Sequence, residues 1–423
     1  MIKSRIVTKN VLILSYGELF RIGTFFLINI FLARYLGSRG FGMYSYVFSF
    51  ASFIVILSDF GLSKLVMREV GREKNLIDTL LENIASLKII LSCIAFVIIA
   101  VVTLVIEDSA YLRLLIFIAS LHYLVLSFND LLHAFFIAFE KLYIVTLSKI
   151  VQFILLLGLV WYAMRSRIGM VGIILCFLVA AIISFGINMA LIMRYFKKMK
   201  LKINLPLYKS LLKKSLPFAL SAFFAIASIR LGVIFLTKIR GASEAGFYSA
   251  ANSILVSLMV LPEIFNRIIF PRLSYYHTHS PDSFIKSLMT TFKMMTVMSF
   301  LIVFIIYLTS SYIISFVYGL EFMGSAYLLS ILIWAFLILC INTFLSHVLQ
   351  SMNHAGGVLH CVFVAFLIDI PMYIILIRKF GMVGACSAFC FSTVLVLFFL
   401  SSYFIKHIKR YIHYHEKDFI PHQ

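Results

Sequence analysis

The sequence has little charge for its length, and that charge is mostly positive. Charged residues make up 13% of the 423 residues and hydrophobic residues 62%, with 37 Lys and Arg against only 17 Asp and Glu. Soluble domains carry about 25% charged residues. The composition therefore excludes an ordinary soluble protein and predicts a chain that lies in a lipid bilayer.

The sequence also lacks the features of several other function classes. The net charge of +20 could indicate nucleic-acid binding, but no soluble basic domain remains once the apolar runs are set aside, so we expect no nucleic-acid partner. There is no G-x-x-x-x-G-K-[ST], G-x-S-x-G or H-E-x-x-H motif. All six cysteines lie in apolar runs without a neighbouring metal-ligand set. We therefore predict no metal or cofactor, and a protein that is not an enzyme.

Twelve apolar runs are long enough to cross a bilayer core of roughly 30 Å, which takes about 20 residues each. An even number of spans places both termini on one side of the membrane. Most Lys and Arg residues lie in the connections on that side, so the positive-inside rule predicts that both termini are cytoplasmic. The predicted spans are 11–35, 41–62, 84–106, 112–138, 144–164, 170–193, 216–239, 245–268, 288–309, 325–347, 357–377 and 383–405.

Parts of the first half of the chain return in the second half. Gly169-Met170-Val171-Gly172 is repeated as Gly381-Met382-Val383-Gly384. A longer set returns at a constant spacing, with Leu32, Gly37, Gly42, Tyr44, Ser45, Ser49 and Arg68 matched by Leu236, Gly241, Gly246, Tyr248, Ser249, Ser253 and Arg272. The repeat predicts an all-α membrane protein of two six-helix bundles, related by a pseudo-two-fold axis, around a central cavity.

The predicted domains follow from this division. Residues 1–193 form the N-terminal bundle, 194–215 a basic cytoplasmic linker, 216–405 the C-terminal bundle and 406–423 a cytoplasmic tail. We expect substrate to bind between the two bundles, and residues 37–42 to form the tight external turn between the first two spans.

Charged side chains inside spans cost at least ~2.5–3.5 kcal/mol at the bilayer centre, so they are expected to face protein or a water-filled cavity. In the first span, Glu18, Arg21 and Asn29 share one helical face. A polar cavity wall and a locally neutralised Glu18–Arg21 pair are both compatible with this spacing. Arg230 has no carboxylate one helical turn away, and its planar fork suits phosphate oxygens, so it is the best single ligand candidate.

Serine stripes mark two further spans. Ser45, Ser49, Ser52 and Asp59 lie on one stripe, and the second copy carries Ser249, Ser253 and Glu263. Serines alone often indicate close helix packing, but a stripe that ends in a carboxylate favours a cavity wall. The candidates for ion coupling are Asp59, Glu263, Asp130 and Asp369. Asp130 with His133 is compatible with a proton relay or with a structural pair.

The run ARYLGSRGFGMYSY, followed by SDFGLSKLVMREVGR, resembles the N-terminal signature of bacterial polysaccharide-biosynthesis membrane proteins. These are the O-antigen and capsule oligosaccharide flippases of the multidrug/oligosaccharidyl-lipid/polysaccharide exporter superfamily. The resemblance implies a cationic central cavity lined by the first two helices of each bundle. It also implies an undecaprenyl-diphosphate-linked oligosaccharide as substrate, carried across the bacterial cytoplasmic membrane by alternating access.

Our hypothesis is therefore a flippase in which Arg21 and Arg230 attract the diphosphate and the serine stripes face the sugars. Membrane lipids and other polysaccharide-assembly proteins are further candidate partners. A multidrug or cation antiporter would need an acidic cavity instead. A glycan polymerase or ligase usually has a large external loop, whereas the external connections predicted here are short. A scaffold that transports nothing would leave the buried charges unexplained.

Overall fold

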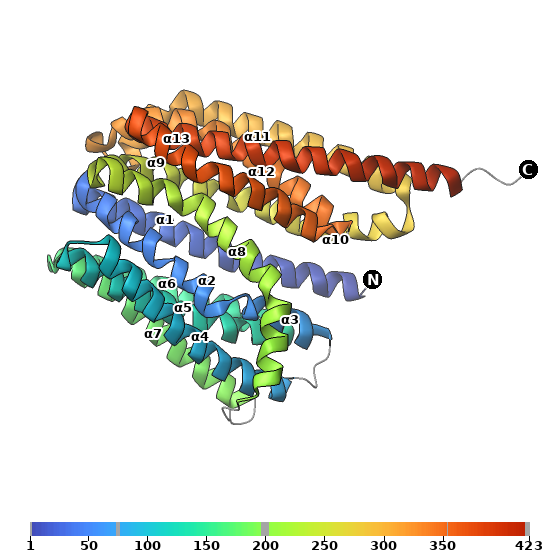
Figure 1. Ribbon diagram of the computed structural model, residues 1–423, viewed down its shortest axis with the longest axis horizontal. Helices are drawn as coiled ribbons and strands as arrows, with labels where there is room; N and C mark the ends of the chain where they lie inside the picture. Colours follow the sequence, from blue (N-terminus) through green and yellow to red (C-terminus); the bar gives the residue numbers. More distant parts are fainter. Residues whose placement is uncertain (1, 73–76, 196–202, 353, 419–423) are drawn as a thin grey trace, which may run out of the picture. The chain divides into compact units, whose positions relative to one another are not determined.

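The protein is built from helices that cross a membrane. The computed structural model describes residues 2–72, 77–195, 203–352 and 354–418, and within these ranges every regular element is helical (Figure 1). Ten helical segments of the described chain are long and apolar enough to span a bilayer. The expected class, a multi-pass all-α membrane protein, is thereby confirmed, whereas the arrangement of twelve spans in two bundles stays a prediction.

Two of the ten segments are interrupted by a glycine. The first interruption lies at Gly37 (φ 67°, ψ 179°) within α1 (Ile2–Ala51), and the second at Gly381 (φ 58°, ψ −133°) within α13 (Ala355–Asp418). These backbone angles disfavour side chains with a Cβ, which explains the glycine at both points. Each interruption falls where two predicted spans meet. The external turn expected over residues 37–42 is confined to Gly37, since the chain is helical again from Ser38.

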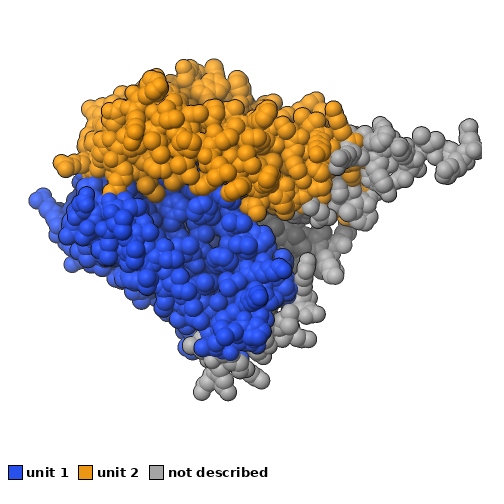
Figure 2. All heavy atoms as spheres, viewed as in Figure 1, with its two compact units in different colours: residues 1–36, 43–230 blue, residues 37–42, 231–423 orange. Residues whose placement is uncertain are grey.

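The chain divides into two compact units, coloured separately in Figure 2. Unit 1 comprises residues 1–36 and 43–230, and unit 2 comprises residues 37–42 and 231–423. The boundary therefore lies within α8, and the short segment 37–42 belongs to the second unit. The predicted domain bounds stay a prediction, and residues 196–202 of the predicted linker and 419–423 of the predicted tail lie outside the described residues.

Unit 1 contains most of α1 and the helices up to α8. These helices are α2 (Phe53–Asp59), α3 (Leu62–Arg72), α4 (Ile77–Ile106), α5 (Ala110–Ala138), α6 (Leu142–Arg165), α7 (Gly169–Tyr195) and, as far as Arg230, α8 (Leu205–Arg240). The short helix α3 is amphipathic, and its apolar face buries Leu62, Leu65 and Val66 in a core shared with Phe135 and Tyr208. Burying this face stabilises the helix more than its intrinsic propensity does.

The predicted span 41–62 is not one continuous helix. It is divided after Ala51 and again after Asp59, where Phe60 (φ 44°) and Gly61 (φ 75°) both adopt left-handed conformations. A left-handed phenylalanine is uncommon and is held only where the surrounding structure determines it. The break places Asp59 at the junction of α2 and α3.

Unit 2 contains α9 (Ala242–Leu258), α10 (Val260–His279), α11 (Pro281–Val317), the 3₁₀ turn η2 (Leu320–Phe322), α12 (Gly324–Ser351) and α13. Segment 37–42 contacts these elements closely. Glu321 accepts a hydrogen bond of 2.7 Å from the backbone N–H of Ser38, and the ring of Phe41 lies 6.1 Å from that of Phe322. This carboxylate caps the helix that restarts after Gly37.

One close helix approach in this unit joins two glycines that the sequence repeat pairs with each other. A Cβ on Gly42 would overlap the carbonyl oxygen of Ala242, and a Cβ on Gly246 would overlap that of Ser38. Each helix therefore needs a residue without a side chain where it crosses the other.

Candidate functional site

Three charged side chains of unit 1, those of Glu18, Arg21 and Lys149, meet at the first part of α1. Arg21 Nε donates a hydrogen bond of 2.7 Å to Glu18 Oε2, and Lys149 of α6 donates to the other oxygen of the same carboxylate. The local Glu18–Arg21 pair considered from sequence therefore exists, but it is part of a larger group. The side chain of Arg21 remains 39% exposed, so its guanidinium can reach a ligand.

A second ion pair lies at the break between α2 and α3. Lys88 of α4 is fully buried, and its ammonium group binds the carboxylate of Asp59. The same carboxylate accepts hydrogen bonds from the hydroxyl and the backbone N–H of Ser63, in the first turn of α3. Lys88 also lies over the ring of Phe128, 5.8 Å from its centroid. Since a buried cation needs a counter-charge, the structure gives Asp59 a structural partner that the sequence did not reveal.

Asp130 of α5 differs from these two carboxylates. It is exposed and forms no hydrogen bond or ion pair with any residue that the structure describes, including His133. It nevertheless lies within electrostatic range of Lys149, Lys88, Arg21 and Asp59. We call this group of six the charged cluster, and its members are Glu18, Arg21, Asp59, Lys88, Asp130 and Lys149.

A neutral polar network lies beside the charged cluster in unit 1. His133 is buried, with Nε2 3.2 Å from the amide nitrogen of Asn188 and 3.5 Å from the hydroxyl of Ser148. Asn188 also donates a 2.8 Å hydrogen bond to Asn129. These contacts join α5, α6 and α7. The hydrogen-bond partners of His133 among the described residues are Ser148 and Asn188, and not Asp130, which the relay considered from sequence would need.

Arg230 is the half-buried cation predicted to bind a ligand. It lies on α8, and within the described residues it has neither an ion pair nor a hydrogen bond. Its guanidinium lies within electrostatic range of the hydroxyls of Tyr44 and Tyr123. The structure shows no direct interaction that brings Arg230 together with Arg21.

The serine stripes have mixed surroundings. Ser52 donates a 2.7 Å hydrogen bond to the carbonyl of Ser49, whereas the buried hydroxyl of Ser49 finds no partner among the described residues. In unit 2, Ser253 bonds to the hydroxyl of Tyr318, and Ser249 is buried without a described partner.

Two further predicted polar positions lie in unit 1. Ser45 is half-buried. The amide of Asn29 donates to the carbonyl of Phe25 at 2.9 Å, which ties it to its own helix.

Unit 2 holds the remaining predicted carboxylates. Asp369 of α13 is 3% exposed and accepts a 2.6 Å hydrogen bond from Ser392, while its second oxygen has no described partner. The buried hydroxyl of Tyr373 also lacks a partner among the described residues. Glu263 is exposed in the first turn of α10. Across the described ranges, no three His, Cys, Asp or Glu side chains are placed to hold a metal ion.

The sequence of residues 7–277 matches the sequence model of a family described as polysaccharide biosynthesis protein. The chain belongs to this family. The resemblance seen in the sequence is thus confirmed, and it covers more than the N-terminal signature.

A curated relative of this polysaccharide biosynthesis protein is the probable low-salt glycan biosynthesis flippase Agl15 of Haloferax volcanii. The two are 26% identical over 189 residues, which is 43% of this chain and 39% of the relative. The matched stretch therefore spans well under two thirds of that relative.

Solved structures share the fold over almost the whole chain. An inward-facing multidrug resistance MATE transporter of the MOP superfamily matches with a TM-score of 0.71 at 15% identity, covering 94% of this chain and 96% of that one. The lipid II flippase MurJ in an inward closed conformation matches with a TM-score of 0.70 at 14% identity, covering 92% and 86%. A Pyrococcus furiosus transporter of the MOP superfamily matches with a TM-score of 0.64 at 14% identity, covering 95% and 96%. At these identities the matches establish a common fold.

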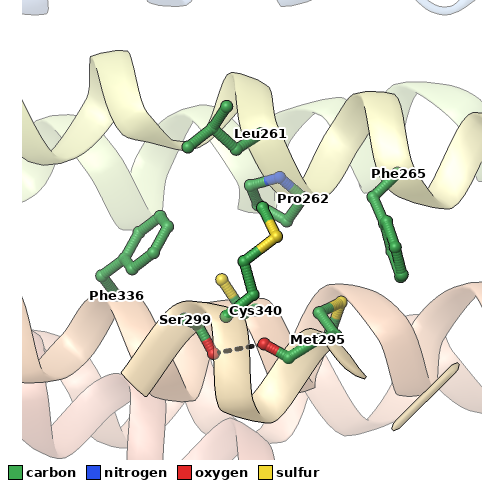
Figure 3. A pocket seen from close by; sticks show the side chains of 8 residues that line it. Leu261, Pro262, Phe265, Met295, Ser299, Phe336 and Cys340 are labelled. Carbon is green, nitrogen blue, oxygen red and sulfur yellow. Dashed lines mark hydrogen bonds between the residues drawn. The ribbon is translucent and has the colours of Figure 1, made fainter. Parts of the chain in front are cut away.

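An apolar pocket between α10, α11 and α12 of unit 2 is a feature that the sequence did not predict (Figure 3). It encloses about 280 Å³, its open mouth included. The single hydroxyl in its wall, that of Ser299, is occupied by a 2.7 Å hydrogen bond to the carbonyl of Met295. The lining residues are Leu261, Pro262, Phe265, Met295, Met298, Ser299, Phe336 and Cys340. This wall offers no charge for an anionic group, so the candidate site remains with the cations of unit 1.

Proposed function

We propose that this polysaccharide biosynthesis protein is a flippase for lipid-linked glycan units. Its substrate would be an undecaprenyl-diphosphate-linked oligosaccharide, moved across the cytoplasmic membrane by alternating access, with both termini of the chain in the cytoplasm. The family, the similarity to a probable glycan biosynthesis flippase and the fold common to MATE transporters and MurJ support this proposal.

The observation that carries the proposal is Arg230. A cation inside a span costs at least ~2.5–3.5 kcal/mol unless it is compensated, and Arg230 lies on a membrane-spanning helix without an ion pair among the described residues. A diphosphate offers several oxygens to a guanidinium fork, and such charge-assisted hydrogen bonds are the strong ones. An anionic headgroup would therefore supply the counter-charge that Arg230 lacks.

Arg21 would be the second contact of the headgroup. It shares Glu18 with Lys149 but keeps more than a third of its side chain exposed. An arriving diphosphate can bind the accessible side of the guanidinium without first breaking the bond to Glu18. The serine stripes would face the sugars, where unpartnered hydroxyls such as that of Ser49 could bond to a glycan.

Ion coupling would require a carboxylate whose charge can change during transport. Asp59 is the least suited, because Lys88 and Ser63 occupy it. In unit 2, Asp369 is buried, and one of its two carboxylate oxygens has no partner among the described residues. We therefore place Asp369 and Asp130 ahead of Asp59 and Glu263 as coupling candidates.

The test replaces Arg230 in a strain that needs this gene for its surface glycan. Arg230→Ala should abolish the glycan and Arg230→Lys should retain part of it, because Lys keeps the charge but loses the planar fork. Arg165→Ala is the matched control, since Arg165 is exposed at the end of α6. Full glycan with Arg230→Ala, at a normal amount of protein in the membrane, would remove Arg230 from the mechanism.

A multidrug or cation antiporter is the second candidate, favoured by the MATE fold and by the three carboxylates of the charged cluster. Deletion should then raise susceptibility to cationic drugs and leave lipid-linked glycan units unchanged. A flippase predicts the opposite pattern, with glycan units retained on the cytoplasmic leaflet. Units that accumulate on the outer leaflet would indicate a polymerase or ligase.

A further inference from the structure

The first part of α8 extends beyond the length that is needed to cross a bilayer. The helix has 36 residues, about 54 Å at 1.5 Å per residue, whereas a bilayer core of roughly 30 Å takes about 20 residues. Pro217 lies inside the helix and interrupts its backbone hydrogen bonds, and α8 changes direction along its length (Figure 1). Since Lys209, Lys213 and Lys214 precede Pro217 and are costly in the core, we expect residues 205–216 at the bilayer surface. We call them the surface segment.

Contacts on one face hold the surface segment to the rest of unit 1. Tyr208 and Leu211 are buried in the core that α3 shares, and the hydroxyl oxygens of Tyr208 and Ser86 lie 2.6 Å apart. The backbone of α8 also approaches the break between α2 and α3, where a Cβ on Gly61 would lie 2.7 Å from the carbonyl oxygen of Ser215. The surface segment therefore has a fixed inner face, and its other face is available for contacts outside the protein.

The available face carries lysines followed by leucines. Lys209, Lys213, Leu216 and Leu220 are spaced by four, three and four residues, which places them on one side of the helix. All four are exposed, Leu216 by 43% and Leu220 by 38%. Neither lysine forms an ion pair with a residue that the structure describes. We call these four residues the lysine–leucine stripe, in which charge lies toward the start of the helix and hydrocarbon toward its membrane-spanning part.

We propose that the lysine–leucine stripe binds a membrane phospholipid with an anionic headgroup. The headgroup phosphate lies at Lys209 and Lys213, and an acyl chain runs along Leu216 and Leu220. The order of charge and hydrocarbon along the stripe is the order in which a phospholipid presents them at a membrane surface. Lysine also suits this position, because its apolar stem can lie along lipid while its ammonium group stays among the headgroups. The inference does not depend on what the protein transports.

The charges around the stripe favour an anionic headgroup over a zwitterionic one. Lys214 adds a third cation directly after Lys213, and the sequence of the surface segment contains no Asp or Glu that would repel a phosphate. Arg68 of α3 lies over the ring of Phe218, 5.3 Å from its centroid, and brings its own carboxylate partner, Glu69, at 2.8 Å. The excess positive charge therefore lies on α8, where each lysine near an anionic surface adds to the attraction.

The experiment measures lipid binding to the purified full chain in an uncharged detergent, by mass spectrometry of the intact protein. The probes are dioleoylphosphatidylglycerol and dioleoylphosphatidylcholine, which have the same acyl chains. Phosphatidylglycerol should bind more tightly. Lys209→Gln with Lys213→Gln should weaken the first phosphatidylglycerol bound by about 30-fold, which is five- to sixfold for each lysine. Leu216→Ala with Leu220→Ala should weaken both lipids by a similar factor.

The matched control is Arg165→Gln with Arg167→Gln. It removes the same amount of positive charge from exposed residues at the end of α6, and it should keep the wild-type affinity for phosphatidylglycerol. An equal affinity in the wild type and the lysine variant overturns the proposal, because the lysines are then merely solvated. An equal loss in the arginine control overturns it as well, since the attraction would then depend on net charge alone.

Farnesyl diphosphate, added as a competitor, separates a membrane phospholipid from a diphosphate lipid. If it displaces phosphatidylglycerol, and the lysine variant loses farnesyl diphosphate binding to the same extent, the stripe belongs to a diphosphate lipid and the phospholipid assignment is wrong. None of these results tests Arg230, so failure here leaves the flippase proposal standing. If the double lysine variant does not fold, Lys213→Gln alone decides, with an expected loss of five- to sixfold.

Discussion

The ion pair between Asp59 and Lys88 predicts a large and specific loss of stability when the carboxylate is removed. Asp59→Asn leaves the ammonium group of Lys88, whose side chain is fully buried, without its partner. Breaking a buried pair in this way costs about 3–5 kcal/mol, because the remaining charge is neither solvated nor compensated. The amide oxygen of Asn can still accept a hydrogen bond from Ser63, so the expected loss comes from the ion pair and not from the cap of α3.

The companion variant Lys88→Met should be milder. Asp59 is 17% exposed whereas Lys88 is fully buried, so the isolated charge of Asp59 costs less than that of Lys88. The double variant, Asp59→Asn with Lys88→Met, removes both charges and should recover most of the loss. A coupling free energy of about 3 kcal/mol is expected between the two positions.

The assay is thermal unfolding of the four proteins in detergent. In a unit of about 200 residues each kcal/mol shifts Tm by roughly 2–4 °C, so Asp59→Asn should lower Tm by roughly 10 °C and the double variant by much less. Asp108→Asn, at an exposed aspartate, is the control and should leave Tm unchanged. A double variant no more stable than Asp59→Asn, or a silent Asp59→Asn, would refute the reasoning and return Asp59 to the candidates for ion coupling.

Three further outcomes follow from the structure. Gly42→Ala should severely reduce the amount of folded protein, because overpacking costs at least ~1–3 kcal/mol and the overlapped atom is a backbone carbonyl oxygen. Gly158→Ala is the control and should be tolerated, because its new Cβ meets no atom within 4 Å. Fluorescence-detected size exclusion measures the folded protein of both variants. Glu321→Ala should cost about 0.5–2 kcal/mol through loss of the cap at Ser38, and no change in Tm would contradict that role. Asp369→Asn should abolish transport while Ser392→Ala only weakens it, if Asp369 is the coupling carboxylate; unchanged glycan with Asp369→Asn at normal protein amounts would exclude it.

The sequence predicted the membrane class and many of the polar positions because both depend on local composition. A chain with 62% hydrophobic residues has few alternatives to a bilayer, and a charge inside an apolar run is visible without knowing the fold. The pairing of Glu18 with Arg21 was also accessible, since the two residues lie one helical turn apart.

The partners contributed by distant helices were not accessible from the sequence. Lys88 was visible as a charge inside a span, but its bond to Asp59 depends on how α4 packs against the α2–α3 junction. Lys149 reaches Glu18 from α6 for the same kind of reason. The break at Phe60 also escaped the sequence, because phenylalanine normally avoids a left-handed conformation and gives no local signal for one.

The crossing of Gly42 and Gly246 has a consequence for reading mutational maps of this chain. Neither residue carries a functional group, yet nearly every replacement at either position should fail in a saturation screen, since each side chain would enter the backbone of the other helix. A screen scored by activity alone would rank these two positions beside any residue that contacts a substrate, although their role is helix packing. Measuring the amount of folded protein for each variant separates positions needed for folding from positions needed for activity. Positions where many replacements fold but lack activity are the ones to assign to the functional site.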